Sequence, residues 1–458
     1  MDDGVISLAE RMSKQREAGP PSEDGLALAF AERHADSLRF VADWNRWMAF
    51  DGVHWQRDST LHVYDRVRAL CREAADSSQQ RAVKSAKTVA GVERLARSDR
   101  KLAATVDQWD SEPMHLTADG ITYDLTTGEG INCDPLDYNT KTTGCTIAPL
   151  GTPHPTWTRF LDRVLPDREV QRFLQRYIGY CCTGLTREHA FIFAYGSGAN
   201  GKSTFINTIA KVLGDYATTA AMETFIHSRN DRHPTDLAKL HGSRLVVAQE
   251  TQKGRRWDET KIKALTAGDR ISARFMRQDF FDFTPTFKLL IGGNHKPRLF
   301  TVDDAMKRRL LLLPFTIQIP AAERDKQLMD KLVPEHPAIL GWCVEGCLQW
   351  QSTGLAPPAS VTEATDAYFA DQDTVGQWIE ECTYDAGPAA FTRLSALFES
   401  WKQWCEERNL KPGSTNFLSD TLQERSYAKK REAKTGQIVL ARITLKTGGC
   451  QRDEPPPF

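Results

Sequence analysis

The chain lacks the features that place a protein across a membrane or outside the cell. No apolar stretch in its 458 residues approaches the roughly 18 residues that a membrane span needs. Its first residues, Met-Asp-Asp-Gly-Val, contain no basic region followed by an apolar run, as a signal peptide would. We therefore expect a cytoplasmic protein with no membrane partner.

Zinc-type and redox-type cysteine motifs are also missing. The ten cysteines include no C-x-x-C pair, so no cysteine-built metal site is expected. A large charge of one sign is missing too, because 59 Lys/Arg against 60 Asp/Glu give a net charge of −1. This balance excludes a protein that binds polyanions over its whole surface.

The positive charge that is present gathers in two zones. Residues 253–309 contain 14 Lys/Arg against 7 Asp/Glu, and residues 393–446 contain 11 against 6. Such zones are typical of surfaces that bind polyanions. They are equally typical of solvated helix faces, and the counts alone leave both readings open.

The N-terminal third shows no catalytic constellation. Residues 1–35 are polar and are interpreted as a flexible tail. Residues 36–156 combine aromatic strand patterns, an Asp51-Gly52 hairpin signal and stretches of helical spacing. We interpret this segment as a helical or α+β accessory domain.

The rest of the chain alternates in its hydrophobic pattern. Residues 157–320 contain four short apolar runs separated by helical segments, near 190–195, 244–248, 287–291 and 309–314. This pattern predicts an α/β core with a buried, mainly parallel sheet. Residues 321–370 predict a helical lid or linker. Residues 371–458 contain two helical segments and a basic hairpin, the pattern of a winged-helix DNA-binding domain.

The strongest motif is a phosphate-binding loop. It matches G-x-x-x-x-G-K-[ST] between an apolar run and a helix, with the residues Gly196, Ser197, Gly198, Ala199, Asn200, Gly201, Lys202, Ser203 and Thr204. The glycines allow backbone N–H groups to surround phosphate oxygens, and the helix N-terminus adds partial positive charge. Lys202 should reach the β- and γ-phosphates of ATP, and the Ser203 hydroxyl should bind Mg²⁺.

Three further segments carry side chains that such an enzyme needs. Glu250 follows an apolar run and is expected to hold Mg²⁺ or orient the attacking water. Asn294 follows the next run and is expected to contact the γ-phosphate or its water. Arg308 and Arg309 precede the last run, and one of them could extend to the next subunit's ATP as an arginine finger. The alternatives are a surface acid, an amide that caps a Gly-rich turn and a solvated basic pair.

A hairpin is expected around residues 271–281. Apolar and charged residues alternate there about a short polar turn, and Arg274 and Arg277 are interleaved with aromatic residues. Such side chains suit contacts with the backbone and bases of single strands. The alternative is a core hairpin whose charges are satisfied within the protein. On a simple strand the two arginines face different surfaces. We expect Arg277 to contact DNA and Arg274 to pair with an acid in the core.

The segment from about Trp157 to Pro320 resembles the superfamily 3 helicases. In particular it resembles the helicase halves of phage and plasmid primase-helicases, which are related to the poxvirus primase-helicase. Five motifs in family order carry the resemblance: the loop ending at Thr204, the run ending at Glu250, Leu-Thr-Ala-Gly-Asp ending at Asp269, Gly-Asn294-His-Lys-Pro297, and Arg308-Arg309 before Leu-Pro-Phe315. Residues 36–156 and the C-terminal segment resemble the family's flanking domains.

The resemblance implies an AAA+-like P-loop ATPase core, with ATP and Mg²⁺ as cofactors. It implies a hexameric ring with ATP between subunits, a DNA-gripping hairpin in the channel, and movement on single-stranded DNA at replication forks. The site residues carried over are Lys202, Ser203, Glu250, Asn294 and one of Arg308/Arg309. A phage, prophage or plasmid protein in a bacterial host is expected.

Two departures from the family pattern affect these expectations. Many members have two acids where this chain has Gln249-Glu250, so Glu250 would serve with Ser203 alone in the metal shell. The primase domain that usually precedes the helicase is not expected, because about 35 residues precede the accessory domain. A separate primase is the expected partner.

Two other functions are compatible with the same residues. The chain could be a replication initiator that binds an origin while ATP controls assembly, or a DNA-sensing ATPase of a mobile element. A small-molecule kinase is disfavoured, because the hairpin and the basic C-terminal segment would then have no purpose.

Overall fold

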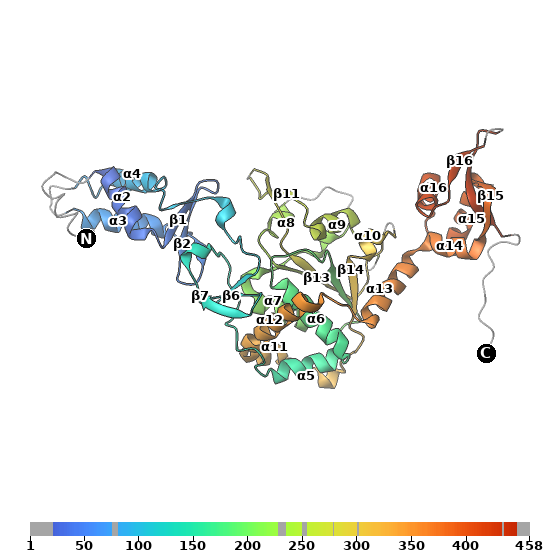
Figure 1. The fold of residues 1–458 in the computed structure, drawn as a ribbon, viewed down its shortest axis with the longest axis horizontal. Helices are drawn as coiled ribbons and strands as arrows, with labels where there is room; N and C mark the ends of the chain where they lie inside the picture. The colour runs from blue at the N-terminus through green and yellow to red at the C-terminus, as the bar shows by residue number, and fades with distance from the viewer. Residues whose placement is uncertain are drawn as a thin grey trace. The chain divides into compact units, whose positions relative to one another are not determined.

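The computed structural model describes residues 22–75, 81–227, 235–249, 254–277, 279–299, 302–432 and 435–446. The chain forms two compact units (Figure 1). The first contains Met1–Pro297 and Arg308–Thr362, and the second contains Arg298–Lys307 and Glu363–Phe458. Each unit has its own structure and is described separately.

The first unit begins with a small mixed domain. Three helices, α2 (Glu23–His34), α3 (His62–Glu73) and α4 (Ala86–Ala96), pack on a four-stranded sheet of order β3-β2-β1-β4, which comprises β1 (Leu38–Val41), β2 (Arg46–Phe50), β3 (Trp55–Arg57) and β4 (Ala103–Ala104). The hairpin expected at Asp51-Gly52 is confirmed as the β2–β3 connection. A three-stranded antiparallel sheet follows, which comprises β5 (His115–Ala118), β6 (Ile121–Asp124) and β7 (Glu129–Asn132). One 3-10 turn precedes it, η2 (Val106–Gln108), and another follows it, η3 (Pro135–Asp137).

The interpretation of residues 1–35 as a flexible tail is wrong for residues 23–34. These residues form α2, and Leu26, Ala27, Phe30 and Ala31 are buried in the core of the N-terminal domain. Their spacing places all four on one helix face. The Ser22 hydroxyl caps the helix by accepting a hydrogen bond from the Gly25 N–H at 3.1 Å. Two of the four buried residues are alanines, which are small and only weakly apolar, so composition alone did not indicate a buried helix face.

The centre of the first unit is a five-stranded parallel sheet of order β14-β8-β13-β10-β9. Its strands are β8 (Phe191–Tyr195), β9 (Ala217–Thr219), β10 (Leu245–Gln249), β13 (Lys288–Gly293) and β14 (Leu310–Pro314). The four apolar runs in the sequence are therefore confirmed as neighbouring strands of an α/β fold. The edge strand β9 was not foreseen, because Ala-Thr-Thr carries no apolar run.

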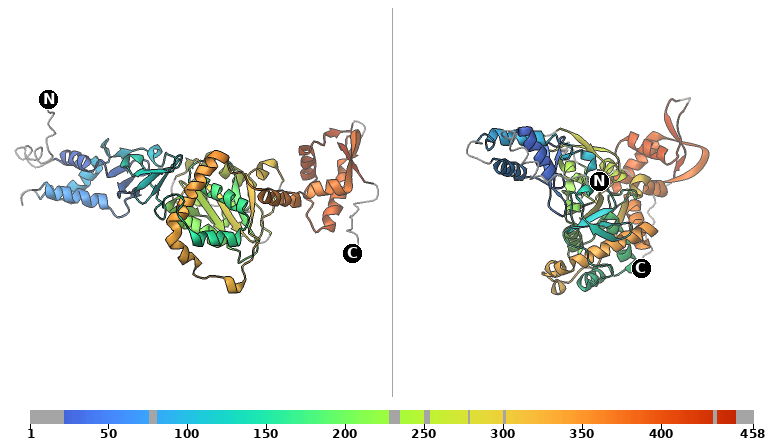
Figure 2. Two further views of the ribbon diagram at one scale, coloured as in Figure 1. Left: turned by 60° about the horizontal axis from the view of Figure 1, so that its bottom comes forward. Right: turned by 60° about the vertical axis from the view of Figure 1, so that its left-hand side comes forward.

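Both faces of this sheet are covered. Successive side chains of a strand point to opposite faces, so the apolar strands place side chains on both. Ile192 and Ala194 of β8 join the main core with α5 (Pro155–Val164), α6 (Arg168–Cys181), α7 (Lys202–Leu213) and α12 (His336–Thr353) (Figure 2). Phe191 and Phe193 point the other way and meet Trp257 edge-on, at ring-centroid distances of 5.7 and 5.5 Å.

The remaining elements of the first unit are short. They are η4 (Gly214–Tyr216), η5 (Met222–Phe225), α8 (Thr235–Ala238), α9 (Glu259–Ala267), β11 (Ile271–Ala273), β12 (Phe281–Phe283), η6 (Ala321–Glu323), α11 (Leu328–Leu332) and η7 (Val333–Glu335). No helix among the described residues is long and apolar enough to cross a membrane.

The second unit contains a three-stranded antiparallel sheet of order β15-β17-β16 packed on helices. Its elements are α10 (Asp304–Lys307), α13 (Ala359–Gln372), α14 (Thr374–Cys382), β15 (Thr383–Arg393), α15 (Leu394–Glu407), α16 (Thr415–Glu424), β16 (Lys429–Arg431) and β17 (Ile438–Leu445). Four tryptophan and leucine side chains at the centre of its core, Trp378, Trp404, Leu397 and Leu440, are fully buried. The two helices and the basic hairpin expected from the sequence are present, and α13 runs across the boundary drawn at residue 371.

Candidate nucleotide site and DNA-contacting hairpin

The phosphate-binding loop connects β8 to α7 and is fixed against the chain that follows β14. Gly196 has φ 151°, and a Cβ atom there would lie 2.1 Å from the carbonyl oxygen of Phe315. Two hydrogen bonds hold the same approach: Phe315 N–H donates to Tyr195 O at 2.8 Å, and Ile319 N–H donates to Ala199 O at 2.8 Å. Only glycine allows this contact between two backbones.

Lys202 is the first residue of α7, and its ammonium group points back into the loop. Its Nζ donates to Gly196 O at 2.7 Å, to Asn200 Oδ1 at 3.0 Å and to Asn294 Oδ1 at 3.3 Å. The residue is only 6% exposed, and burial lowers its pKa. The ammonium is thus held by neutral oxygens, and an anion beside it would be favoured.

The start of α7 supplies donors next to this lysine. Gly201 adopts φ 85°, and the first N–H that donates back into the helix is that of Phe205, to Gly201 O at 2.9 Å. The N–H groups of the preceding helical residues therefore lack intrahelical acceptors. The Ser203 side chain is exposed beside them, where its hydroxyl is available to a ligand.

The carboxyl ends of neighbouring strands bring the other expected residues to this edge of the sheet. Asn294 follows β13 and reaches Lys202 directly. Gln249 ends β10, and its Nε2 donates to Asn207 Oδ1 on α7 at 2.8 Å. Glu250 comes next in the sequence and lies outside the described residues, so the structure leaves its expected role in the metal shell untested. The described residues include no cluster of three or more His, Cys, Asp or Glu that could hold a metal.

Arg308 and Arg309 lie at the opposite end of the sheet. They precede β14, whose Leu310 pairs with Phe191 at the start of β8, and the Phe191 N–H donates to Arg309 O at 2.7 Å. The loop follows the other end of β8, about 13 Å away for a five-residue strand at ~3.3 Å per residue. The structure therefore separates the two arginines from Lys202 within one chain.

The hairpin expected around residues 271–281 is confirmed. Strands β11 and β12 pair antiparallel, with Ala273 opposite Phe281. Three large apolar side chains of the turn are exposed, at 38%, 67% and 59% of their area: Phe275, Met276 and Phe280. Arg277 is exposed with φ 61°.

The expectation that Arg274 pairs with an acid is wrong for the part of the chain that the structure describes. Its guanidinium lies over the ring of Phe280 at 4.7 Å from the centroid. The register explains this contact, because Arg274 and Phe280 are the next residues across the turn after the Ala273–Phe281 pair. The turn thus presents cations beside aromatic rings.

Two contacts at the phosphate-binding loop were not predicted from the sequence. The Asn200 Nδ2 donates to Phe315 O at 2.9 Å, so Asn200 connects the loop to the chain after β14 while its Oδ1 accepts from Lys202. The Lys296 ammonium lies 4.5 Å from the ring centroid of Tyr195, the residue before the loop. The Gly-Asn-His-Lys-Pro motif contains the signal for the second contact, but its partner is distant in sequence.

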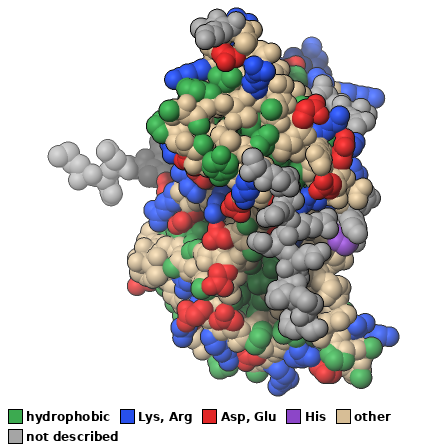
Figure 3. All heavy atoms as spheres, turned by 90° about the vertical axis from the view of Figure 1, so that its right-hand side faces the viewer, with side chains coloured by type: hydrophobic (Ala, Val, Ile, Leu, Met, Phe, Trp, Pro, Cys, Tyr) green, Lys and Arg blue, Asp and Glu red, His purple; other side chains and the backbone are tan. Residues whose placement is uncertain are grey.

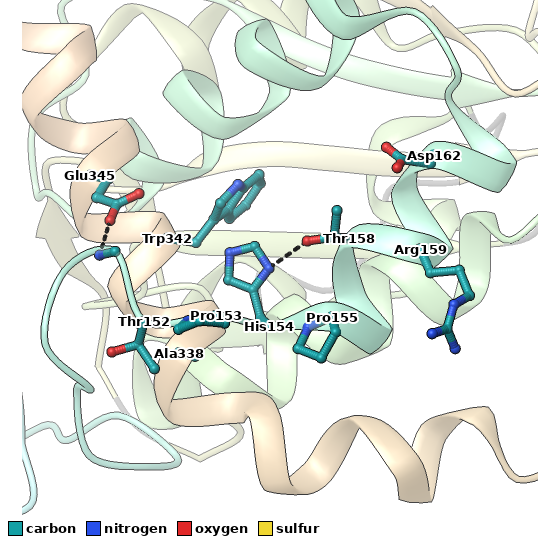
Figure 4. A pocket seen from close by; sticks show the side chains of 11 residues that line it. Thr152, Pro153, His154, Pro155, Thr158, Arg159, Asp162, Ala338, Trp342 and Glu345 are labelled. Atoms are coloured by element: carbon teal, nitrogen blue, oxygen red, sulfur yellow. Dashed lines mark hydrogen bonds between the residues drawn. The ribbon is translucent and has the colours of Figure 1, made fainter.

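A separate pocket of about 580 Å³ lies beside the start of α5 (Figure 4). His154 Nδ1 is 2.9 Å from Thr158 Oγ1, and Glu345 Oε1 accepts from the Gly151 N–H at 2.5 Å. The Glu335 carboxylate accepts from the N–H groups of Thr156 and Trp157, both at 2.9 Å. The N-terminus of α5 is therefore already capped, and none of the motif residues lines this pocket.

Two family models match the chain. Residues 27–166 match the family described as "D5 N terminal like", and residues 194–309 match a family of unknown function, DUF5906. The first match overlaps the accessory domain of residues 36–156. The second contains the phosphate-binding loop, the hairpin and the two arginines.

Curated viral proteins are similar to parts of the chain. It is 25% identical over 304 residues to "Putative helicase 022R" of Frog virus 3, covering 62% of this chain and 29% of that protein. It is 27% identical over 180 residues to "Putative helicase L207/L206" of Acanthamoeba polyphaga mimivirus, covering 39% and 19%. It is 22% identical over 279 residues to "Putative primase C962R" of African swine fever virus (strain Badajoz 1971 Vero-adapted), covering 55% and 29%. The chain thus spans less than a third of each of these relatives.

The fold is also similar to a solved structure, the apo A form of the NrS-1 C-terminal region. The TM-score is 0.52 at 9% identity, with 92% of this chain and 99% of that chain covered. The family matches and the viral relatives together support a relation to the D5-like primase-helicases.

Proposed function

We propose that the chain is an ATP-driven motor of the superfamily 3 helicase type that moves single-stranded DNA during replication. The observation that carries the proposal is the position of Lys202, whose ammonium lies between Gly196 O, Asn200 Oδ1 and Asn294 Oδ1 at the carboxyl edge of the parallel sheet. The parallel sheet β14-β8-β13-β10-β9, with the glycine-rich loop after its strand β8, supports the proposed P-loop core. Viral relatives named as helicases and primases favour a replication role.

The residues at this edge fit a nucleoside triphosphate with Mg²⁺. The N–H groups at the start of α7 and the Lys202 ammonium would hold phosphate oxygens. The Ser203 hydroxyl would bind the metal, together with Glu250, which follows β10 in the sequence. Asn294, which already contacts Lys202, would sense whether the terminal phosphate is present. Bound Mg²⁺ would neutralise charge that develops on the phosphates.

The hairpin of β11 and β12 is the proposed DNA contact. Arg277 at the exposed turn would contact phosphates, and the exposed rings of Phe275 and Phe280 would stack on bases. The Arg274 guanidinium over Phe280 would hold that ring in place.

The test is Lys202→Met, which removes the ammonium and keeps most of the apolar stem. Loss of one phosphate donor should reduce ATP turnover by about 10²–10³-fold, with and without single-stranded DNA. Lys211→Met, at the other end of the same helix, is the matched control and should hydrolyse ATP as the wild type does. Wild-type turnover in folded Lys202→Met protein would overturn the proposal, and DNA-independent turnover without fork unwinding would restrict it to an ATPase.

The separation of Lys202 from Arg308 and Arg309 within one chain supports the proposal of a ring with shared active sites. An arginine ~13 Å from the loop along the strand would have to serve the ATP of the next subunit, and we propose a hexamer on the family resemblance. Mixing Lys202→Met subunits with Arg308→Ala/Arg309→Ala subunits should restore turnover that neither variant has alone. Full turnover by a dilute monomer, sized by light scattering, would contradict the ring.

The second candidate is a replication initiator. The second unit contains the helices α15 and α16 followed by the basic β16–β17 hairpin, which supports the winged-helix interpretation and so favours duplex binding. Sequence-specific duplex binding without fork unwinding would favour this function. Fork unwinding that depends on ATP would favour the motor.

A further inference from the structure

Charge in the second unit is divided between its sheet and its helices. The strands β15, β16 and β17 contain five Lys/Arg against one Asp, whereas the helices α14, α15 and α16 contain one Lys against seven Asp/Glu. The sheet and the helices pack against each other over one core. The cations of the strands and the acids of the helices therefore lie on opposite sides of that core. A polyanion would be attracted to the sheet and repelled by the helices.

The helix α16 in particular is unsuited to a polyanion. It is the helix that precedes the β16–β17 hairpin, and it contains Asp420 and Glu424 but no lysine or arginine. Its exposed side chains are Asn416, Asp420, Gln423 and Glu424. A phosphate backbone along this helix would meet negative charge without a compensating cation.

The cations of the sheet are mostly available. Arg442 pairs with Asp385 at 2.7 Å. Among the described residues, neither Arg393 nor Lys430 lies within ion-pair distance of an acid, and both are exposed. Both are paired in register with Val439 of the central strand β17. Residues directly opposite each other on neighbouring strands share a face, so Arg393 and Lys430 flank the same strip of sheet.

Aromatic side chains lie on the same strands. Phe391 is 46% exposed and Tyr384 is 51% exposed, although both are large hydrophobic groups; both lie on β15. The Lys430 ammonium lies 5.1 Å from the ring centroid of Phe391. Phe391 pairs with Ala441 and Tyr384 with Thr444, roughly 10 Å apart along β17. Arg442 between them has φ 70° and interrupts the alternation of β17, because Leu440 and Ile443 both lie in the core. Ala441 and Thr444, and with them Phe391 and Tyr384, therefore share the face away from the core. Figure 3 shows that apolar and cationic side chains are exposed next to each other on the face of the protein that it draws.

We infer that this sheet face, defined by Tyr384, Phe391, Arg393 and Lys430, binds single-stranded DNA and that α16 does not. Cations at phosphate-binding positions beside exposed rings are the combination that single strands use, because only unpaired bases can stack on side chains. The inference rests on the proposed function for the choice of DNA. It assigns the strand a second contact, separate from the β11–β12 hairpin.

The experiment measures binding of the full chain to a labelled oligothymidine by fluorescence anisotropy, without nucleotide and over a range of salt concentrations. Arg393→Ala/Lys430→Ala should lower the slope of log affinity against log salt by about 1.4, at ~0.7 per phosphate contact on single strands. Phe391→Ala should weaken binding about 5-fold or more, and Phe391→Tyr should restore it. Lys402→Ala, which removes one cation from α15 in the same unit, should bind as the wild type does.

Melting temperature and basal ATP hydrolysis should be unchanged in all four variants, because the substituted side chains are exposed and far in sequence from the loop. Wild-type affinity and salt slope in Arg393→Ala/Lys430→Ala, with binding lost in Arg277→Ala, would overturn the inference and leave the proposed motor intact. Equal losses for duplex and single strand in the double variant, with no effect of Phe391→Ala, would overturn the assignment to single strands. Loss of binding by Lys402→Ala to the same extent would show a general charge effect and would also overturn it.

Discussion

The contact between Gly196 and Phe315 makes the loop sensitive to a single methyl group. In Gly196→Ala the new Cβ would lie 2.1 Å from Phe315 O and 2.6 Å from Asn200 Nδ2. Gly198 lies two residues away in the same loop, and a Cβ there would meet no atom within 4 Å. Comparing Gly196→Ala with Gly198→Ala therefore separates the effect of the backbone contact at Gly196 from the general effect of adding a methyl group to this loop.

The magnitude follows from what must move. Relieving the overlap requires the loop and the chain after β14 to part by about 1 Å, which would weaken the Asn200–Phe315 and Phe315–Tyr195 hydrogen bonds of 2.9 and 2.8 Å. Each such bond contributes about 0.5–1.5 kcal/mol net, and the backbone at φ 151° adds about 1–3 kcal/mol of strain for a residue with a Cβ. We expect Gly196→Ala to lose about 2–4 kcal/mol of unfolding free energy and Gly198→Ala less than about 0.5 kcal/mol.

Urea unfolding of both variants measures the stability difference, and nucleotide binding with ATP turnover measures the consequence for the site. Gly196→Ala should also lose most turnover, because Lys202 Nζ donates to the carbonyl of the displaced residue. If the two variants unfold at the same urea concentration, or if Gly196→Ala hydrolyses ATP as the wild type does, the backbone contact does not hold the loop and the reasoning is refuted.

Three other predictions concern single side chains. Burial of Lys288, which lies over the Tyr180 ring and beside Cys181, Cys182, Cys347 and Arg244, lowers its pKa to about 7. Above this pH the unfolded chain binds one proton more than the folded chain, so the free energy of unfolding should rise by up to about 1.4 kcal/mol per pH unit above pH ~7. Lys288→Met should abolish this rise in urea titrations. Glu250→Gln should bind ATP but hydrolyse it slowly, and wild-type turnover would shift attention to Asp269. Arg277→Ala should lower single-strand affinity and the salt slope by roughly one unit at most and spare basal ATPase, whereas reduced DNA binding by Arg274→Ala with an unchanged melting temperature would reverse the roles of the two arginines.

The sequence predicted the elements whose local pattern is complete in itself. The apolar runs of β8, β10, β13 and β14 are continuous because both faces of the sheet are covered, and such runs are legible without tertiary information. The loop at Gly196–Ser203 is likewise contiguous. The edge strand β9 and the helix α2 were missed because their burial depends on partners: β9 pairs with β10, and the alanines of α2 are buried by α4 and the first sheet.

Side-chain partners were less predictable than backbone elements, and Arg274 shows the physical reason. Alternation along a strand assigned it to the core, where a charge needs an acid. The turn instead begins at the residue after Ala273, so Arg274 leaves the strand and meets Phe280 across the turn. An arginine over a ring at a partly exposed site is stabilised without a carboxylate. The start of the turn depends on the register between β11 and β12, and register is a pairing between distant residues that composition does not encode.

Strand pairing also separates Lys202 from Arg308 and Arg309. Lys202 begins α7, and Arg308 and Arg309 precede β14. The order of these residues in the sequence alone is also compatible with a single site in one chain. Parallel pairing of β14 with β8 places the arginines at the amino edge and the loop at the carboxyl edge. Since phosphate-binding loops act at the carboxyl edge, an arginine at the amino edge of the same sheet can reach a triphosphate only if another copy of the chain presents its own carboxyl edge there. A requirement for a second subunit therefore follows from strand direction, if either arginine takes part in hydrolysis.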